Sequence, residues 1–263
     1  MQVKKARNAL SSSFAIDKEE KSMSTLVFER YEKKYLMTRH QQEQLLDRLT
    51  GHLVPDVYGS YSIANIYYDT ESYALIRSSL EKPVYKEKLR LRSYGTPSAG
   101  DTVFLELKKK YQGIVYKRRI SFPYDDHAEM LQEDYLHSDA QVAREIGFFL
   151  SQHEVSVAAY ISYDRVAFAD SHSPEVRITF DHNILFRQNE LRLGAGSWGK
   201  ALLEEDLILM EIKIPGAFPL YLSRVLSEMG IYSVSFSKYG NCFQRFIMNP
   251  HRQEKRWATC LIS

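Results

Sequence analysis

Cationic side chains recur at every second position in residues 86–119, the part of the sequence with the clearest chemical character. The even positions at its start hold Lys86, Lys88, Arg90 and Arg92, and leucine fills the odd positions between the last three. Successive side chains in a β-strand point to opposite faces. A strand here would carry a row of positive charge on one face and apolar side chains on the other.

The next two candidate strands repeat this alternation. One carries Glu106, Lys108 and Lys110, and after a turn the other carries Lys117 and Arg119. An ordinary strand with a solvated outer face also alternates, so the pattern alone does not say which face meets water. Like charges opposite each other on neighbouring strands destabilise a sheet, however. The repeated cations therefore favour a face that binds an anion.

The composition limits the class of protein. A chain of 263 residues with 44% hydrophobic and 26% charged residues is globular and can bury a large core. The 13% aromatic fraction favours strands. A net charge of only +2 argues against a generally basic nucleic-acid coat. The spacing of Cys242 and Cys260 fits neither a metal site nor a disulfide framework.

The ends of the chain and its apolar runs give a first domain plan. Residues 1–24 are polar and rich in Ser and Lys, and residues 250–263 are polar and basic, so both are expected to be flexible tails around a domain of residues 25–249. No apolar run reaches the roughly 20 residues of a membrane span, and the N-terminus lacks a signal-peptide core. We expect a cytoplasmic protein.

Further strands are predicted on both sides of the cationic region. Residues 28–37 alternate and place Arg30, Glu32 and Lys34 on one face, and residues 62–69 are rich in Ile and Tyr. Taken alone, this Arg-x-Glu-x-Lys pattern is typical of a surface ladder.

Four helices are expected to pack against the sheet. Thr38 can cap the first, which would carry Leu45, Leu46, Leu49 and Leu53. A short helix is expected over residues 70–80, and another over residues 220–229. The longest candidate covers residues 126–152, where apolar residues recur at helical spacing, and no chemistry is assigned to it.

Two more charged strands follow the long helical candidate. Residues 157–169 carry Arg165, and residues 175–185 place Arg177 and Asp181 on one polar face. The Gly-rich residues 194–199 lack the Lys-Ser/Thr ending of a phosphate-binding loop, so they are not read as a nucleotide cradle.

The stretch Leu207–Ile214 is nearly all apolar, and Glu211 and Lys213 are its only charges. Such a strand is expected to be buried on both sides. A buried charge is costly unless it is paired or ligates a metal. The two residues are thus either a structural ion pair with a neighbouring strand or part of a metal and anion site.

About eight strands are predicted in all, and most carry charges on one face. An antiparallel sheet of this size can close into a barrel, which turns one face into a lumen. We therefore expect an α+β fold, an eight-stranded antiparallel β-barrel tunnel with helices packed outside. A lumen lined by Arg, Lys and a few Glu suits a linear polyanion and a divalent metal.

The order of these motifs resembles the VTC domain, the polyphosphate polymerase domain of the vacuolar transporter chaperone within the triphosphate tunnel metalloenzyme superfamily. The resemblance spans about residues 28–246. Its motifs are RxExKY from Arg30, NIYYDT from Asn65, KLRLRSYG from Lys88, FLELK from Phe104, YDRVAF from Tyr163, VRITFD from Val176, MEIKIPG from Met210 and FSKY from Phe236.

The resemblance implies a tunnel in which the γ-phosphoryl group of ATP is added to the end of an inorganic polyphosphate chain, assisted by Mn²⁺ or Mg²⁺. Carried over by position, the residues implied to contact phosphate are Lys34, Arg90, Arg92, Lys108, Lys117, Arg165, Arg177, Lys213 and Lys238, with Arg119 as an addition. Glu211 is implied to hold the metal. Glu32 and Glu106 are either metal ligands or partners that orient the cations. Arg118 breaks the alternation and is left out.

Two other functions remain open at this stage. Related tunnel proteins hydrolyse inorganic triphosphate or nucleoside triphosphates with a similar lining, and a non-catalytic polyphosphate-binding module would need the same cations. Eukaryotic VTC relatives attach a phosphate-sensing domain and membrane helices, neither of which is found in this sequence, so export would require a membrane partner. Nucleic acid is not an expected ligand, because the aromatic residues do not alternate with the cations on one face.

Overall fold

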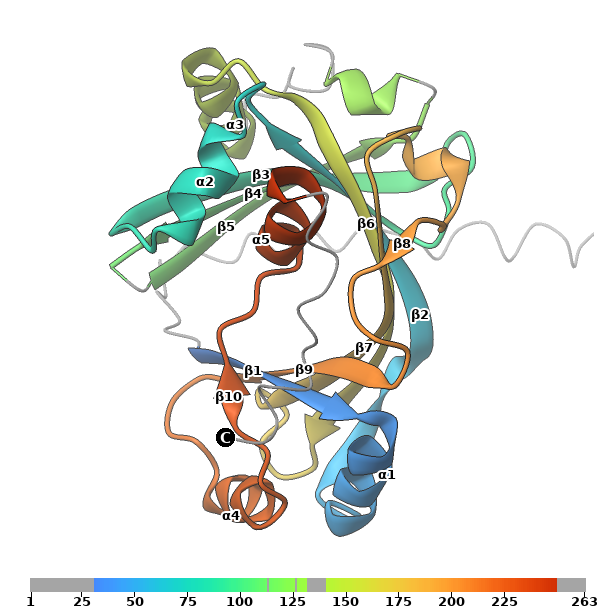
Figure 1. Cartoon of the computed structure of the whole chain (residues 1–263), viewed down its shortest axis with the longest axis vertical. Helices are drawn as coiled ribbons and strands as arrows, with labels where there is room; N and C mark the ends of the chain where they lie inside the picture. The colour runs from blue at the N-terminus through green and yellow to red at the C-terminus, as the bar shows by residue number, and fades with distance from the viewer. Residues whose placement is uncertain (1–30, 113, 126, 132–140, 250–263) are drawn as a thin grey trace, which may run out of the picture.

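The chain is organised around one long antiparallel sheet, seen in a computed structural model that describes residues 31–112, 114–125, 127–131 and 141–249 (Figure 1). The expected tails, residues 1–24 and 250–263, lie outside these residues, as does Arg30. The strands are β1 (Tyr31–Thr38), β2 (Leu53–Asp69), β3 (Tyr85–Tyr94), β4 (Thr102–Tyr111), β5 (Ile114–Pro123), β6 (Ser156–Asp170), β7 (Arg177–Arg187), β8 (Lys200–Ala201), β9 (Leu207–Ile214) and β10 (Ser233–Val234).

Helices lie between these strands and pack against the sheet. They are α1 (Arg39–Arg48), α2 (Ala74–Leu80), α3 (Gln141–Gln152), α4 (Leu220–Glu228) and α5 (Lys238–Cys242), with short turns η1 (Ala128–Met130), η3 (Leu193–Ala195) and η4 (Phe243–Met248). The expected α+β class, an antiparallel sheet with helices outside it, is confirmed.

The sheet does not close into the barrel that the sequence predicted. Its strand order is β10-β1-β9-β7-β6-β2-β3-β4-β5, with β8 beside β7, and no ladder among the described residues joins β5 to β1. The reason lies at the edge of β1, where Lys34 and Tyr35 pair with the short strand β10. That edge is therefore not free over these two residues to pair with β5.

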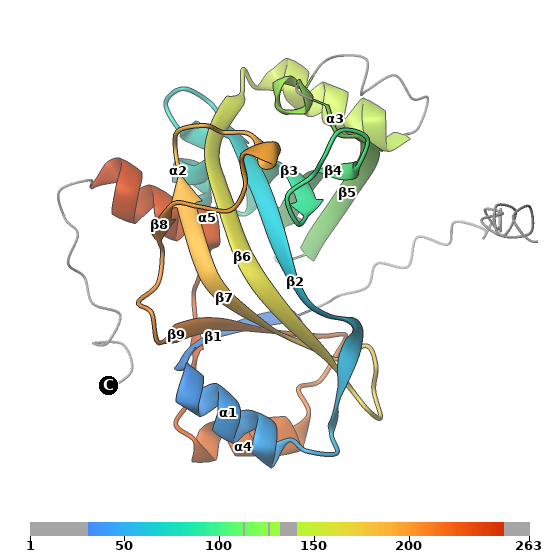
Figure 2. The ribbon, with the colours of Figure 1, turned by 90° about the vertical axis from the view of Figure 1, so that its right-hand side faces the viewer.

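The sheet nevertheless curves strongly: β2, β6 and β7 run between β3–β5 at one end of the molecule and β1 and β9 at the other (Figure 2). Six steps in the strand order separate β1 from β4, which in a flat sheet would place them roughly 29 Å apart. Yet Glu32 on β1 feels the charge of Lys108 on β4: burial acts to raise the pKa of Glu32, but the Lys108 and Lys34 charges outweigh it and the pKa is lowered. We call the concave, charge-bearing side of the sheet the inner face.

The outer face is apolar and is covered by helices. Leu89, Leu91, Leu105 and Leu107 pack with Ile146 and Phe149 of α3, and a second cluster joins β1, β7 and β9 to α1 and α4. A third apolar cluster covers one part of the inner face, where α2 and α5 pack on β2, β6 and β7. The alternation that predicted a sheet with one apolar and one charged face is confirmed, and the charged part of the inner face lies outside these apolar clusters.

The first helix is capped as predicted, although it is shorter. The Thr38 side chain accepts from the Gln41 amide while the Gln41 side chain accepts from the Thr38 amide, a reciprocal capping box. The helix ends at Arg48, so Leu49 is its C-cap and Leu53 already belongs to β2. Strand β2 is also longer than the predicted 62–69, because a bulge lets its first part continue along β6.

The predicted helix over residues 126–152 is wrong in its first part. Residues 128–130 form a single 3₁₀ turn, and Leu131 follows with φ of 49°, a left-handed conformation that no helix continues through. The Glu129 backbone carbonyl accepts from Tyr68, and its carboxylate accepts from the Leu193 amide. These contacts hold the turn on the sheet, and the next described residues form α3 (Gln141–Gln152). Residues 132–140 lie outside the described part of the chain.

Candidate functional site: a cationic inner face with two buried carboxylate clusters

The strand registers place the predicted site residues on the inner face. Across β3 and β4, Lys88 stands opposite Lys108 and Arg90 opposite Glu106; across β1 and β9, Lys34 stands opposite Glu211. The remaining pairs are Lys108 with Lys117, Glu106 with Arg119, Arg165 with Asp181, and Arg177 with Lys213. The alternation in the sequence therefore predicts correctly which side chains share a face, and residues far apart in the chain lie on one surface.

Glu106 is the centre of the first cluster. Its Oε2 accepts from Arg90 Nε at 2.9 Å and Nη2 at 2.7 Å, and its Oε1 accepts from Arg119 Nε at 2.8 Å. Lys117 Nζ lies 2.8 Å from Oε1, and Arg92 Nε lies 3.7 Å from Oε2. Only 1% of the Glu106 side chain is exposed. Four cations thus surround one carboxylate, and three positive charges are left without a partner in the cluster.

The electrostatics of this cluster keep Glu106 ionised. Burial acts to raise its pKa, but the charges of Arg90 and Arg92 and the contact with Lys117 hold it well below the usual range. A group with a lowered pKa stabilises the fold above its unfolded pKa and loses that contribution in acid. At neutral pH, Glu106 therefore acts as a fixed negative charge that orients four cations toward the inner face.

The second cluster joins Glu211 to Asp181 through two cations. Lys238 Nζ donates to Asp181 Oδ2 at 2.6 Å and to Glu211 Oε1 at 2.9 Å. Arg165 donates to both Asp181 oxygens, at 2.6 and 2.7 Å, and approaches Glu211 Oε2 at 3.5 Å. Lys34 Nζ lies 3.6 Å from Glu211 and 3.2 Å from Glu32. Unlike the first cluster, this one is close to charge balance.

Local structure fixes each member of the second cluster. Glu211 sits on the central strand β9, whose residues are nearly all buried, so the predicted burial of this strand is confirmed. Lys238 is the first residue of α5, whose N-cap Ser237 accepts from the Gly240 amide. Burial acts to lower the pKa of Lys238, but the charges of Asp181 and Glu211 raise it, so the amine stays protonated.

Between the clusters lie two lysines whose charge is poorly compensated. Lys88 donates to Ser237 Oγ at 3.1 Å, and burial together with the charges of Lys86 and Lys108 lowers its pKa to about 7. Burial likewise lowers the pKa of Lys108 to about 8, despite the opposing charge of Glu32. Lys108 is accessible to solvent although protein surrounds it, as expected for a side chain inside a concave, open surface. An anion placed here would favour the charged form of both amines.

Not every predicted residue joins these clusters. Arg177 is exposed and forms an ion pair with Asp56 of β2, and Lys213 has no carboxylate among the described residues within ion-pair distance. These two stand opposite each other at one end of the inner face. Arg118, left out because it breaks the alternation, indeed points away and donates to Glu145 of α3 at 2.9 Å.

The sequence analysis assigned no role to several residues that support the cations. Asp181 carries the shortest contacts of the second cluster, Asn65 accepts from Arg92 Nε at 3.0 Å, and Tyr67 OH lies 3.3 Å from Arg90 Nη1. Lys238 Nζ lies over the Tyr163 ring, 4.4 Å from the centre of that ring. All four fall at inner-face positions of strands that the sequence did predict. Extending the alternation to every polar residue, acidic or uncharged, would have indicated a role for them.

The donor atoms suit a divalent cation that arrives with phosphate. Among the described residues, no three His, Cys, Asp or Glu side chains lie close enough together to hold a metal ion. Mg²⁺ commonly uses one or two protein carboxylates and completes its shell with water and phosphate oxygens. Glu211 beside Asp181 offers such carboxylates, and the Lys238 ammonium between them shows that a cation is accommodated there.

The fold and site define a class of protein: a curved antiparallel sheet whose inner face carries excess Arg and Lys around a few buried carboxylates. The VTC domain family matches residues 29–247, and the chain belongs to that family. The resemblance read from the sequence is thereby confirmed. Family membership connects the chain with the phosphoryl-transfer and polyphosphate chemistry of triphosphate tunnel proteins.

Solved structures resemble this chain at low sequence identity. A "putative adenylate cyclase" from Bacillus halodurans is 15% identical with a TM-score of 0.50, over 82% of this chain and 96% of that one. Another "putative adenylate cyclase", from Vibrio parahaemolyticus, is 12% identical with a TM-score of 0.43, over 81% of this chain and 96% of that one. A chain of the Schizosaccharomyces pombe Mediator head module is 9% identical with a TM-score of 0.42, over 76% of this chain and 90% of that one.

No curated protein matches the sequence. Within the described residues, no helix is both long and apolar enough to cross a membrane.

Replacing Glu106 by Gln should separate its two possible roles. Without the carboxylate, four neighbouring cations repel one another, two of which, Arg90 and Arg92, are partly or fully buried. We expect the free energy of unfolding in urea to fall by about 3 kcal/mol. Tripolyphosphate should bind at least as tightly as to the wild type, because the cluster gains one net positive charge. Glu145→Gln, on the outer face, is the matched control and should cost about 1 kcal/mol or less. A folded Glu106→Gln protein that no longer binds tripolyphosphate would instead indicate a metal ligand.

The affinity for tripolyphosphate should depend on pH through Lys88. Its folded pKa of about 7 lies below the unfolded value, so the free protein gains stability as pH rises above 7 while the charge needed by an anion is lost. Between pH 7 and pH 9 the dissociation constant of the wild type should therefore rise about tenfold more than that of Lys88→Gln. The dissociation constants are measured by calorimetry on both proteins. The titration of the ligand itself is common to the two and cancels in the comparison. Equal pH dependence in the two would contradict this role.

Proposed function

We propose that the inner face binds ATP and the end of an inorganic polyphosphate chain, and that the protein transfers the γ-phosphoryl group to that end. One observation carries the proposal: the positive charge on this face exceeds the carboxylates that accompany it, at Glu106 and again at Lys88 and Lys108. Such a surface is costly when empty and is compensated by a linear polyanion.

The cations divide the work of holding phosphate. Arginine forks contact phosphate oxygens bidentately, whereas lysines act as compact point charges. In this proposal the phosphate-binding residues are Lys34, Arg90, Arg92, Lys108, Lys117, Arg119, Arg165, Arg177, Lys213 and Lys238. The ion pair with Asp56 places Arg177 at the margin, and the first cluster supplies the largest unbalanced charge. Glu106 and Asp181 would keep the arginine planes in fixed orientations.

The transfer step requires no nucleophilic side chain. A terminal oxygen of the polyphosphate chain attacks the γ-phosphorus and forms a new P–O–P linkage. The bond between the γ-phosphorus and the β–γ bridging oxygen breaks, and ADP leaves with the bridging oxygen. Charge spreads over the transferred oxygens, so that fixed cations lower the barrier by positioning and neutralisation. Arg90, Lys108 and Lys34, which come from different strands, can approach one phosphoryl group from different sides.

Glu211 is the residue proposed to hold Mn²⁺ or Mg²⁺, which when bound would neutralise charge on the phosphate oxygens. The protein prepares the position of this carboxylate. Arg165 and Lys238 approach one Glu211 oxygen each, and the Thr179 hydroxyl lies 3.5 Å from the backbone oxygen of Glu211. Because Lys238 also binds Asp181, its ammonium can move toward that carboxylate when a metal arrives.

A second candidate, hydrolysis of tripolyphosphate or nucleoside triphosphates, is favoured by one feature of the fold. The described strands β1 and β5 are not joined, and the Lys108 and Lys117 side chains reach solvent. Whether water or phosphate attacks depends on how well water is excluded. A long polyphosphate chain along the inner face would itself cover this opening, which favours synthesis once a chain is bound.

The test is to incubate the purified protein with ATP and Mn²⁺ and to separate the products on a polyphosphate gel. We expect a ladder of chains, reduced at least about 100-fold in Glu211→Ala, because the proposed metal ligand is lost. Glu154→Ala, an exposed carboxylate after α3, is the matched control and should behave like the wild type.

Other outcomes would redirect the proposal. Release of free phosphate without a ladder would support the hydrolase. Tight binding of polyphosphate without turnover, with either Mn²⁺ or Mg²⁺, would identify a binding module.

A further inference from the structure

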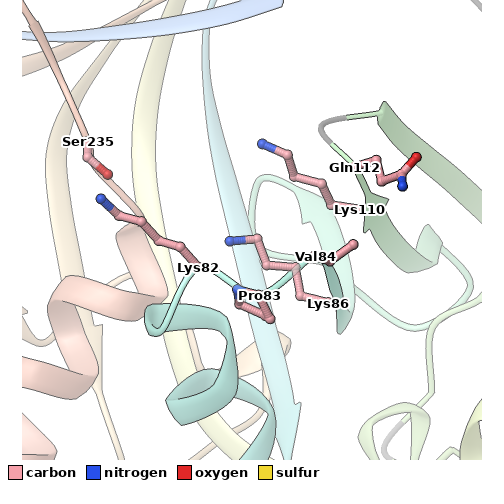
Figure 3. A pocket seen from close by; sticks show the side chains of 7 residues that line it. All are labelled: Lys82, Pro83, Val84, Lys86, Lys110, Gln112 and Ser235. Carbon is pink, nitrogen blue, oxygen red and sulfur yellow. The ribbon is translucent and has the colours of Figure 1, made fainter.

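A pocket of about 350 Å³ lies at the end of the cationic strands, beyond the residues proposed for phosphoryl transfer (Figure 3). Three segments build it: the turn between α2 and β3, the paired ends of β3 and β4, and the segment before α5. The lining residues are Lys82, Pro83, Val84, Lys86, Lys110, Gln112 and Ser235. Three lysines thus line the pocket together with no Asp or Glu.

The pocket continues the row of charge on the inner face. Arg90 pairs with Glu106, the next inner-face pair along the ladder is Lys88 with Lys108, and the pair after that is Lys86 with Lys110. Lys110 lies four positions beyond Glu106 on β4, which is about 13 Å along the strand. This distance is longer than three linked phosphate groups, so a triphosphate held at Glu106 does not fill the pocket.

Within the described part of the chain, no carboxylate forms an ion pair with the three lysines of the pocket. Lys86 donates to the Ser79 carbonyl at 3.2 Å, and burial together with the charges of Lys110 and Lys82 lowers its pKa. The nearest acid in the sequence of β3, Glu87, points to the opposite face, where it binds Tyr85 and lies 3.8 Å from Lys109. In Figure 3 the Lys86 and Lys110 side chains extend into the same space.

We propose that this pocket is a subsite for the distal part of a polyphosphate chain whose end lies at the Glu106 cluster. The inference rests on the proposed function for the identity of the chain, and adds that the protein distinguishes a polymer from a nucleotide by length. The continuous series of cross-strand pairs provides the path, and the three ammonium groups, which form no ion pair with a carboxylate among the described residues, provide the recognition. The pocket thereby holds a growing chain between successive additions.

The test compares the binding of tripolyphosphate and long-chain polyphosphate to Lys86→Gln/Lys110→Gln. The double variant should bind long-chain polyphosphate at least about tenfold more weakly than the wild type, since two charge-assisted contacts are lost. Its affinity for tripolyphosphate should stay within about twofold. Lys33→Gln/Lys200→Gln loses the same net charge at exposed positions off the inner face and should change neither affinity. Melting temperatures verify that all variants fold.

Several outcomes would overturn the subsite. One is equal weakening of both ligands in the pocket variant, and another is equal weakening by the pocket and control variants, which would indicate a general effect of charge. Orthophosphate that competes with long-chain polyphosphate only in the wild type would identify the pocket as a site for free phosphate. The binding assay is independent of synthesis: a length-selective loss in a protein that makes no polymer would leave the subsite standing while the polymerase falls.

Discussion

The structure depends on one electrostatic constraint, the confinement of more positive than negative charge on the concave face of a sheet. Glu106 alone holds four cations, and Glu211 and Asp181 hold three more. Each buried carboxylate lowers the repulsion enough for the chain to fold. None cancels the repulsion at Lys88, at Lys108 or in the pocket lined by Lys82, Lys86 and Lys110. The remaining positive charge costs folding stability in the free protein and is compensated when a polyanion binds. Folding and anion binding therefore place opposite demands on the same residues.

The rest of the architecture allows this face to be strained. Stability comes from the opposite side of the sheet, where leucines of β3 and β4 pack on α3 and the strands around β9 pack on α1 and α4. The curvature of the sheet brings β1 and β4 within electrostatic reach, and α5 brings Lys238 to the carboxylates from the end of the chain. Residues separated by more than 200 positions, such as Lys34 and Lys238, therefore act on the same glutamate.

The sequence predicted the inner face well because a strand has a period of two. Once Arg90 and Arg165 are on strands, side-chain parity determines which residues share their face, and the registers bear this out. Closure of the sheet was not predictable in this way, since it depends on whether β10 or β5 pairs with β1. The 3₁₀ turn at residues 128–130, where the sequence predicted a helix, is held by tertiary contacts of Glu129 that periodicity does not contain. The sequence placed Asp181 on the same polar face as Arg177, but its role depends on Arg165 and Lys238 of other elements, which strand parity does not show.

The central claim, that the inner face is electrostatically incomplete without a polyanion, is tested most directly by thermal unfolding of the wild-type protein. Melting should be followed in increasing tripolyphosphate and, separately, in sodium chloride of equal ionic strength. The account predicts a saturable rise in melting temperature with tripolyphosphate alone, corresponding to about 2.7 kcal/mol at 100 times the dissociation constant. The same melting temperature in both series would show that the cations are merely screened by salt, and would contradict the account.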